Sequence, residues 1–248
     1  MCGRYFIVMT PATMRGMLSY PEMPNFPSRY NVAPTQPIPL VRMWEGQRQF
    51  ALMRWGLLPS WVKDPKSFTL LINARADTVN EKPAFRNAMK RRRCLIPADG
   101  FYEWKRDGAV KRPYLIRMTG SAPFAIAGLW ETWVGPNGEE LDTVAMITTD
   151  ANAVLAPIHH RMPVILPSDR FETWLDCANV NAKDAAALLV PASDDAMEAF
   201  EISSAVNRVA NDGPEIQQPY TAPEVIEPAP KPKAARAPKI DERQTSLF

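Results

Sequence analysis

Short apolar or alternating segments separated by turn residues constrain this fold more than any other feature of the sequence. Asp107-Gly108 and Asn137-Gly138 each separate two strand-like runs, and both dipeptides suit hairpin turns because they tolerate positive φ. The pattern predicts an α+β, β-rich fold with a mostly antiparallel sheet or open barrel. We expect strands over residues 37–43, 48–56, 94–97, 113–118, 123–133, 141–148 and 162–166.

Helical segments are fewer and do not alternate with the strands, which argues against a Rossmann-type fold. The second candidate helix would place Phe85, Ala88 and Met89 on one face. Asn181 has the side chain of a helix N-cap and would begin the last one. We expect a few peripheral helices, over residues 11–20, 82–92, 168–176 and 181–189.

The composition changes near residue 218. The chain has 248 residues, 46% of them hydrophobic, and we assign residues 1–218 to one globular domain. Residues 219–243 repeat Pro, Ala, Lys and Glu with almost no aromatic content, so we expect a disordered tether there. Residues 244–248 end the tail with the apolar pair Leu-Phe.

Other counts bear on compartment and partners. Cys2, Cys94 and Cys177 are odd in number and far apart, which argues against a disulfide framework and against a zinc site. There is no run of about 18 apolar residues for a membrane span, and the start lacks the apolar core of a signal peptide. We therefore expect a cytoplasmic monomer that needs no metal or cofactor.

Cys2 has the most distinctive chemistry in the chain. Met1 is readily lost before a small residue, and its removal would leave Cys2 with a free α-amine beside its thiol. These groups have ordinary pKa values of about 7.7–8.0 and about 8.5, so both are partly deprotonated near neutral pH. The amine can form a Schiff base with an aldehyde, and the thiol can then close a five-membered thiazolidine. The alternative is that position 2 only needs a small residue.

Two polar clusters provide candidates for catalysis and phosphate binding. Asn73 and Arg75 follow the apolar run 70–72 and would share one face of a strand, where an amide and a guanidinium can hold a phosphate. Glu103 lies among aromatic residues in Gly-Phe-Tyr-Glu-Trp, where desolvation would raise its pKa and suit a general acid or base. The alternatives are an ordinary strand end and a solvent-facing glutamate.

The two histidines of the chain, His159 and His160, precede Arg161 and an apolar run. A histidine that transfers protons beside an arginine that binds phosphate is one reading, and a hydrogen-bonded structural histidine is the other. Neighbouring residues of a strand face opposite sides, so these two would rarely share a metal.

Basic and aromatic residues are also clustered, although the net charge is only +2. The basic runs are Lys90 to Arg93, Lys105-Arg106 and Lys111-Arg112, which suit either a solvated surface or a groove that follows phosphates. Of the tryptophans near Pro59, Trp55 should be buried in a strand and Trp61 exposed, where it can stack on bases.

Taken together, these segments resemble the SRAP family, the SOS-response-associated peptidase fold that shields abasic sites in DNA. The resemblance covers almost all of residues 1–213 and implies a β-rich fold with a positively charged groove for single-stranded DNA. It rests on Cys2-Gly3-Arg4, Asn31 to Pro34, Arg54-Trp55-Gly56, Asn73-Ala74-Arg75, Gly100 to Trp104, Gly128-Leu129-Trp130, His159 to Pro163, and Asn207.

The resemblance also implies a mechanism, in which Cys2 captures the ring-opened abasic sugar as a thiazolidine crosslink in the DNA damage response. Asn73 would orient the sugar or Cys2, Glu103 would transfer protons, and His159 would act as acid or base. Single-stranded DNA would be held by Arg4, Arg75, Arg161, Trp61 and Pro34. The family name refers to an autopeptidase activity that would release Met1. A nucleoid-associated protein is then expected.

The last five residues resemble a different signal, the glutamine-led peptide ending in Leu-Phe that docks on bacterial sliding clamps. Gln244, Leu247 and Phe248 would make that contact, and the alternative is a frayed terminus.

Two other classes of protein remain open. N-terminal-nucleophile amidohydrolases also begin Met-Cys-Gly, and there Cys2 would attack an amide with its own amine as base. A DNA-binding module without chemistry would use the same groove and leave Cys2 unreacted.

Overall fold

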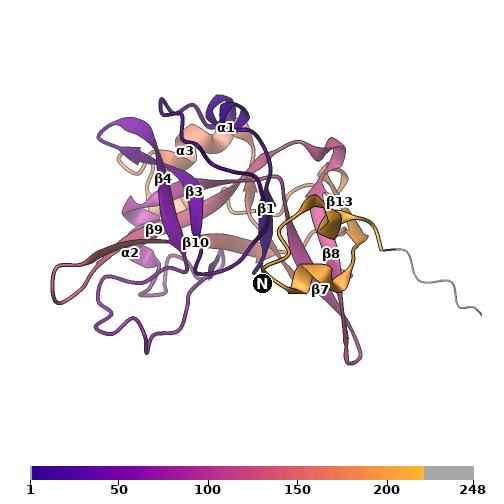
Figure 1. Ribbon diagram of the computed structural model, residues 1–248. Coiled ribbons are helices and arrows are strands. Elements are labelled where there is room, and N and C mark those ends of the chain that lie inside the picture. Colours follow the sequence, from indigo (N-terminus) through magenta and orange to yellow (C-terminus); the bar gives the residue numbers. More distant parts are fainter. Residues whose placement is uncertain (1, 221–248) are drawn as a thin grey trace, which may run out of the picture.

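The computed structural model describes residues 2–220, and hairpins join several of its strands (Figure 1). The two predicted turns are confirmed, because Asp107 pairs with Val110 across one hairpin and Glu140 pairs with Val134 across the other. Gly108 and Gly138 have φ values of 59° and 85°, which a residue with a Cβ rarely adopts. The residues that the sequence marks as turns therefore set the register of both hairpins.

Within residues 2–220 the strands form two sheets. The first has the order β13-β8-β7-β1-β2, and its pairings are antiparallel. Strand β1 pairs with β7 near Phe101, and the Arg4 carbonyl accepts the Tyr102 N–H just beyond that pairing. The strands are β1 (Tyr5–Ile7), β2 (Arg29–Val32), β7 (Gly100–Asp107), β8 (Val110–Met118) and β13 (Met197–Glu201).

The second sheet has the order β11-β10-β4-β3-β6-β9-β12, with β5 also beside β10. Most of its pairings are antiparallel, and β10 runs parallel to β4 and to β5. The α+β, β-rich, mostly antiparallel fold predicted from the sequence is confirmed. The strands are β3 (Pro37–Trp44), β4 (Gln47–Trp55), β5 (Asn73–Arg75), β6 (Arg93–Ala98), β9 (Phe124–Val134), β10 (Glu140–Asp150), β11 (Arg161–Pro163) and β12 (Ile165–Leu166).

The helices are short and lie outside the sheets (Figure 1). Phe85, Ala88 and Met89 are buried as predicted, and the Asn181 side chain accepts the backbone N–H groups of Lys183 and Asp184 as an N-cap. The predicted helices over 82–92 and 181–189 are too long, because turns take up part of each span. The α-helices are α1 (Pro11–Leu18), α2 (Arg86–Arg91), α3 (Phe171–Leu175) and α4 (Ala182–Ala186).

Two predicted strands differ in extent. The span 162–166 is divided between β11 and β12, and the strand expected at 70–72 lies at β5 instead. Leu70 is exposed and Leu71 is half-buried, so apolar character alone placed that strand too early. The candidate residues Asn73 and Arg75 are thus in the strand itself, on either side of buried Ala74.

The larger hydrophobic core lies between the sheets and the helices and includes Cys2, Tyr5, Trp55 and Trp174. A smaller one joins the first sheet to the chain after β13, where Tyr102 and Leu115 meet Val206 and Ile216. That second core fixes residues 203–217 against β1 and β7, next to the start of the chain. Pro219 and Tyr220 continue along the end of β13, where Tyr220 N–H donates to the Glu201 carbonyl.

Within residues 2–220, every helix is too short or too polar to span a membrane.

Candidate active site

The segment Cys2-Gly3-Arg4 runs along β7, and this places the Cys2 side chain inside the protein. The Arg4 carbonyl accepts the Tyr102 N–H at 2.9 Å and the Cys2 Sγ at 3.8 Å. Cys2 is 0% exposed. Burial raises the pKa of its thiol far above the usual range, and the neighbouring Glu103 carboxylate raises it further. The thiol therefore stays protonated near neutral pH, which also protects it from oxidation.

Glu103 is buried on β7, so the solvent-facing alternative for this residue is wrong. Its exposed fraction is 3%, and burial raises its pKa as the sequence predicted. A carboxyl group with a raised pKa, beside a thiol and at the edge of a cavity, can accept or donate a proton near neutral pH.

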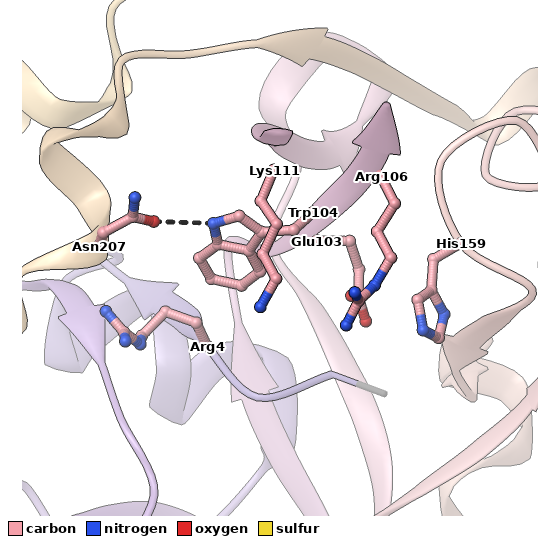
Figure 2. A pocket seen from close by; sticks show the side chains of 7 residues that line it. All are labelled: Arg4, Glu103, Trp104, Arg106, Lys111, His159 and Asn207. Atoms are coloured by element: carbon pink, nitrogen blue, oxygen red, sulfur yellow. Dashed lines mark hydrogen bonds between the residues drawn. The ribbon is translucent and has the colours of Figure 1, made fainter. Parts of the chain in front are cut away.

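A cavity of about 460 Å³ opens beside β7 (Figure 2). It collects residues from four separate parts of the chain: the start, the β7–β8 hairpin, the loop before β11 and the segment after β13. Three cationic side chains surround one carboxyl and one imidazole in it, which suits a phosphate-bearing ligand. The lining residues are Arg4, Glu103, Trp104, Arg106, Lys111, His159 and Asn207.

His159 enters this cavity from the loop before β11. The backbone N–H of Arg161 donates to its Nδ1 at 3.0 Å, which indicates the neutral tautomer with its proton on Nε2. Burial lowers the pKa of His159, so the ring is neutral at pH 7. Strand geometry predicted that His160 would face the side opposite to His159, and this prediction is wrong. The two rings stack with centroids 4.4 Å apart, because both residues precede the strand.

Asn73 is held beside β10 and is half-buried. Its Nδ2 donates to the Ile72 carbonyl at 3.0 Å, and its Oδ1 is buried without a hydrogen-bond partner among the residues described. The Ile72 carbonyl also accepts the Trp55 Nε1, and Trp55 packs edge-on against Tyr5. Asn73 is thereby connected to the strand that follows Cys2, with one acceptor left available.

The three predicted phosphate-binding arginines have different surroundings. Arg4 donates through Nη1 to Asn31 Oδ1 at 2.7 Å and to the Val206 carbonyl at 2.9 Å, while it lines the cavity. Arg75 is exposed on β5. The pKa of the nearby His160 ring is lowered mainly by His159, and Arg75 adds to that effect. Arg161 is only 4% exposed, and its guanidinium bonds to Asp150 Oδ1 and the Thr148 carbonyl at 2.7 Å each.

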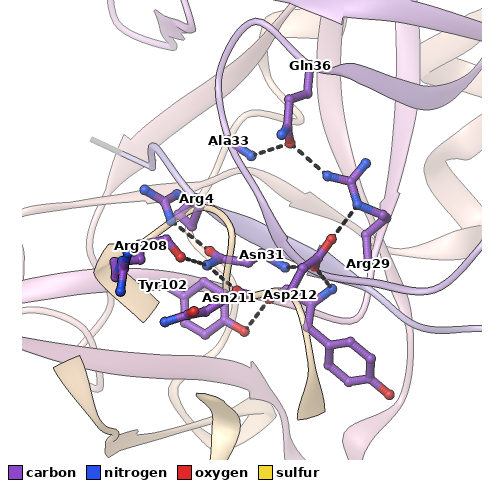
Figure 3. A network of polar contacts seen from close by, with 10 residues as sticks. Arg4, Arg29, Asn31, Ala33, Gln36, Tyr102, Arg208, Asn211 and Asp212 are labelled. Carbon is purple, nitrogen blue, oxygen red and sulfur yellow. Dashed lines mark hydrogen bonds and ion pairs between the residues drawn. The ribbon is translucent and has the colours of Figure 1, made fainter. Parts of the chain in front are cut away.

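A polar network behind Arg4 was missed by the sequence reasoning (Figure 3). The Asn31 amide donates to the carbonyls of Val206, Arg208 and Asn211. The Asp212 carboxylate accepts the backbone N–H groups of Tyr30 and Asn31 and pairs with Arg29 at 2.7 Å.

Asn31 belongs to a motif quoted above, but no local pattern marks Asp212 as its partner 181 positions away. The network fixes the position of the Arg4 side chain.

Trp61 and Pro34 lie outside the first cavity. Trp61 is 57% exposed as predicted, whereas Trp55 is fully buried. The Trp61 ring contacts Phe68, and Phe68 lines a second cavity of about 500 Å³ together with Thr35. Pro34 precedes Thr35 and is half-buried.

Two further predictions concern the tail and metals. Of the tether predicted at residues 219–243, Pro219 and Tyr220 lie along the end of β13 and belong to the fold. The rest of the tether and the predicted clamp contacts Gln244, Leu247 and Phe248 lie outside the described residues. Within residues 2–220, no group of three or more His, Cys, Asp or Glu side chains is arranged to hold a metal ion.

Comparison with known proteins defines the class. The model of the SOS response associated peptidase (SRAP) family matches residues 1–209, and the chain belongs to that family. Among curated relatives, the abasic site processing protein YoqW of Bacillus subtilis is 45% identical over 197 residues, 79% of this chain and 88% of that protein. The abasic site processing protein YoaM of the same organism is 42% identical over 221 residues, covering 87% and 97%.

More distant relatives share the same domain. The abasic site processing protein HMCES of Xenopus tropicalis is 31% identical over 260 residues, covering 87% of this chain and 77% of that protein. A crystal structure of a protein from Bacteroides thetaiotaomicron superposes with a TM-score of 0.80 at 29% identity, over 89% of this chain and all of that one.

Proposed function

We propose that this protein processes abasic sites in single-stranded DNA by forming a covalent crosslink through Cys2. The single observation that carries the proposal is the burial of the Cys2 thiol beside Glu103, at the edge of a cavity that holds His159 and Arg4. Several relatives that are named abasic site processing proteins support the choice of substrate.

The chemistry needs no group from outside the protein and the DNA. After Met1 has been removed, the α-amine of Cys2 adds to the C1′ aldehyde of the ring-opened sugar, and loss of water gives an imine. The Cys2 sulfur then bonds to the imine carbon while its proton moves to the nitrogen. The product is a thiazolidine, in which the former aldehyde carbon can no longer promote strand cleavage by β-elimination.

Each side chain of the site has a role in this sequence. Glu103, with its raised pKa, takes a proton from the amine and returns it to the departing hydroxyl. His159 presents a neutral ring that accepts or donates a proton during opening of the sugar. The unpartnered Oδ1 of Asn73 accepts a hydrogen bond from the α-amine or from a sugar hydroxyl.

Contacts with the DNA follow from the cations and the exposed rings. Arg4 and Arg75 hold phosphates directly, and Arg161 does so by exchanging the exposed carboxylate of Asp150 for a phosphate. Trp61 and Pro34 pack against neighbouring bases beside the second cavity.

The test is a denaturing gel with a single-stranded oligonucleotide that carries one abasic site. We expect an SDS-resistant protein–DNA band from the native protein and none from Cys2→Ala. Cys177→Ser is the matched control, because Cys177 is an internal cysteine without an α-amine and should crosslink normally. Cys2→Ser keeps the amine, so borohydride should trap its imine.

A native protein that gives no band would overturn the proposal in favour of a DNA-binding module without chemistry. Release of ammonia from glutamine would instead favour the amidohydrolase class.

We also propose that the site removes Met1 itself, with Glu103 and His159 transferring the protons. The Cys2 thiol adds to the Met1 carbonyl carbon, the Met1–Cys2 C–N bond breaks as the nitrogen takes up a proton, and water then hydrolyses the thioester to release methionine and the free thiol. The test is intact-mass spectrometry of Glu103→Gln made by translation without methionine aminopeptidase. Retention of Met1 in the variant but not in the native protein is expected. Retention of Met1 in the native protein would reject self-processing, and loss of Met1 from both would reject only the role of Glu103.

The tail has a separate proposed role, in which Gln244, Leu247 and Phe248 dock on a bacterial sliding clamp and deliver the domain to replication forks. In a pull-down with purified clamp, we expect removal of residues 244–248 to abolish retention. Equal retention of the intact and shortened proteins would reject this role and leave the crosslinking proposal untouched.

A further inference from the structure

The β7–β8 hairpin carries two pairs of basic residues directly opposite each other. Lys105 pairs in register with Arg112, and Arg106 pairs with Lys111. Like charges that face each other across two strands destabilise a hairpin unless something neutralises them. The two pairs are one residue apart on each strand, so they project to opposite faces.

The Lys105–Arg112 pair has acidic neighbours. The Arg112 guanidinium lies 3.8 Å from an Asp107 carboxylate oxygen and 3.7 Å from one of Glu201, and these partially neutralise it. The pair therefore has a local structural explanation.

The Arg106–Lys111 pair makes no such ion pair, although Glu103 lines the same cavity. Both side chains are exposed and line the candidate active-site cavity, and within residues 2–220 neither makes an ion pair shorter than 4.0 Å. Figure 2 shows the two side chains extending over the cavity, with Arg106 reaching towards Glu103 and His159. Two uncompensated cations at one opening form a site for an anion.

Trp104 provides a flat surface beside these cations. Its Nε1 donates to Asn207 Oδ1 at 2.8 Å, which fixes the indole plane, and the Arg4 guanidinium lies 5.9 Å from the ring centroid. A fixed aromatic ring next to phosphate-binding cations is the arrangement that stacks a base of single-stranded nucleic acid.

We propose that Arg106 and Lys111 bind the phosphate of a nucleotide adjacent to the abasic sugar, while Trp104 stacks on the base of that nucleotide. This subsite rests on the proposed function, since the sugar must lie at Cys2. It assigns a use to the basic runs of the hairpin and makes crosslinking depend on one particular flanking nucleotide.

The experiment replaces the phosphates around the abasic site with neutral methylphosphonates, one linkage at a time. We expect one linkage on one side of the lesion to slow crosslinking of the native protein about ten-fold at subsaturating protein. In Arg106→Gln/Lys111→Gln, crosslinking should already be about ten-fold slower, and the same methylphosphonate should have no further effect. The dependence of binding on log salt should also become shallower by about 0.7.

Lys105→Gln/Arg112→Gln is the matched control, with the same loss of charge from the same hairpin. It should retain the native rate and the native response to the methylphosphonate. If Arg106→Gln/Lys111→Gln still responds to every methylphosphonate as the native protein does, the phosphate contact is refuted.

A separate experiment tests the base contact: the adjacent nucleotide is replaced by a tetrahydrofuran analogue, which keeps the phosphate but has neither a base nor an aldehyde. The native protein should lose several-fold in rate and Trp104→Leu should be insensitive. Equal sensitivity of the two proteins would refute the stacking. A native protein that never crosslinks would refute the proposed function instead, so the two failures are distinguishable.

Discussion

Two arginines, Arg93 and Arg4, show what separates a structural cation from one that can bind a ligand. Arg93 on β6 is 1% exposed. Its guanidinium donates hydrogen bonds to four backbone carbonyls in and after helices α2 and α3, those of Met89, Trp174, Asp176 and Val180. Those of Met89 and Trp174 belong to the last turns of α2 and α3, where a helix favours positive charge. Each nitrogen of the Arg93 guanidinium therefore donates to an acceptor inside the fold.

Arg4 is also held by internal hydrogen bonds, but only part of its guanidinium takes part in them. One Nη1 is bonded to Asn31 and Val206, its Nε has no partner among the described residues, and the guanidinium borders the cavity. The sequence shows two arginines with basic or polar neighbours and gives no means of ranking them. The number of internal acceptors around each guanidinium decides which one holds the fold together and which one can bind a phosphate.

The largest effect should come from Arg93→Met. The variant leaves four carbonyl groups without their donor in a buried place, so we expect the free energy of unfolding to fall by about 3 kcal/mol or more. Urea denaturation measures it. The exposed Arg91→Met is the control and should change it by less than about 1 kcal/mol. A loss below that level for Arg93→Met would mean that the four bonds add nothing to stability.

Asn31→Ala should affect both the stability of the fold and the binding of DNA by Arg4. Asn31 is 0% exposed and joins Arg4 to three carbonyls of the segment after β13. We expect a loss of about 2 kcal/mol in stability, because buried polar groups lose their partners, together with weaker binding of single-stranded DNA. Thermal unfolding and fluorescence anisotropy measure the two. Unchanged DNA affinity would show that Arg4 keeps its position without Asn31.

Arg4→Gln should reduce binding of single-stranded DNA about ten-fold, since one charge-assisted contact with phosphate is lost. Its loss of stability should be smaller than that of Arg93→Met. Anisotropy at several salt concentrations provides the readout. An affinity equal to that of the native protein would remove Arg4 from the DNA site.

The smallest effect concerns Glu103. Burial raises its pKa, so the folded protein holds this proton more tightly than the unfolded chain. The stability that the neutral form contributes is fully present below the unfolded pKa of about 4.3 and is lost as pH rises through the folded pKa.

Glu103→Gln avoids that loss and should raise Tm slightly at pH 7, with a difference that disappears below about pH 4. Its crosslinking should be slow at all pH values. A Tm below that of the native protein at pH 7 would contradict the assignment of an unfavourably buried carboxyl.

The strands and turns were predictable because their signals are local. Alternation of apolar residues and the two glycine turns act within a few positions, and they placed β3, β4 and the β9–β10 hairpin to within two residues. Prediction failed where tertiary contacts override local character, as at residues 70–72 and at the paired histidines, which stack in a loop rather than diverge along a strand.

The candidate site was predictable only in part. Cys2, Glu103 and His159 were found from their chemistry and from the family resemblance, and the structure brings Glu103 and His159 to one cavity with Cys2 beside them. Asp212 was not found, because an aspartate in a loop has no distinctive surroundings in the sequence.

By itself, the sequence determined the β-rich class of the fold and the presence of a cysteine whose amine and thiol can close a ring on an aldehyde. Both depend on covalent order and on short-range periodicity. Only the tertiary structure decided that Arg93 is internal, that Arg106 and Lys111 share a cavity with Arg4, and that Asp212 supports Asn31. Those facts depend on contacts between distant segments, which form when apolar surfaces are buried together.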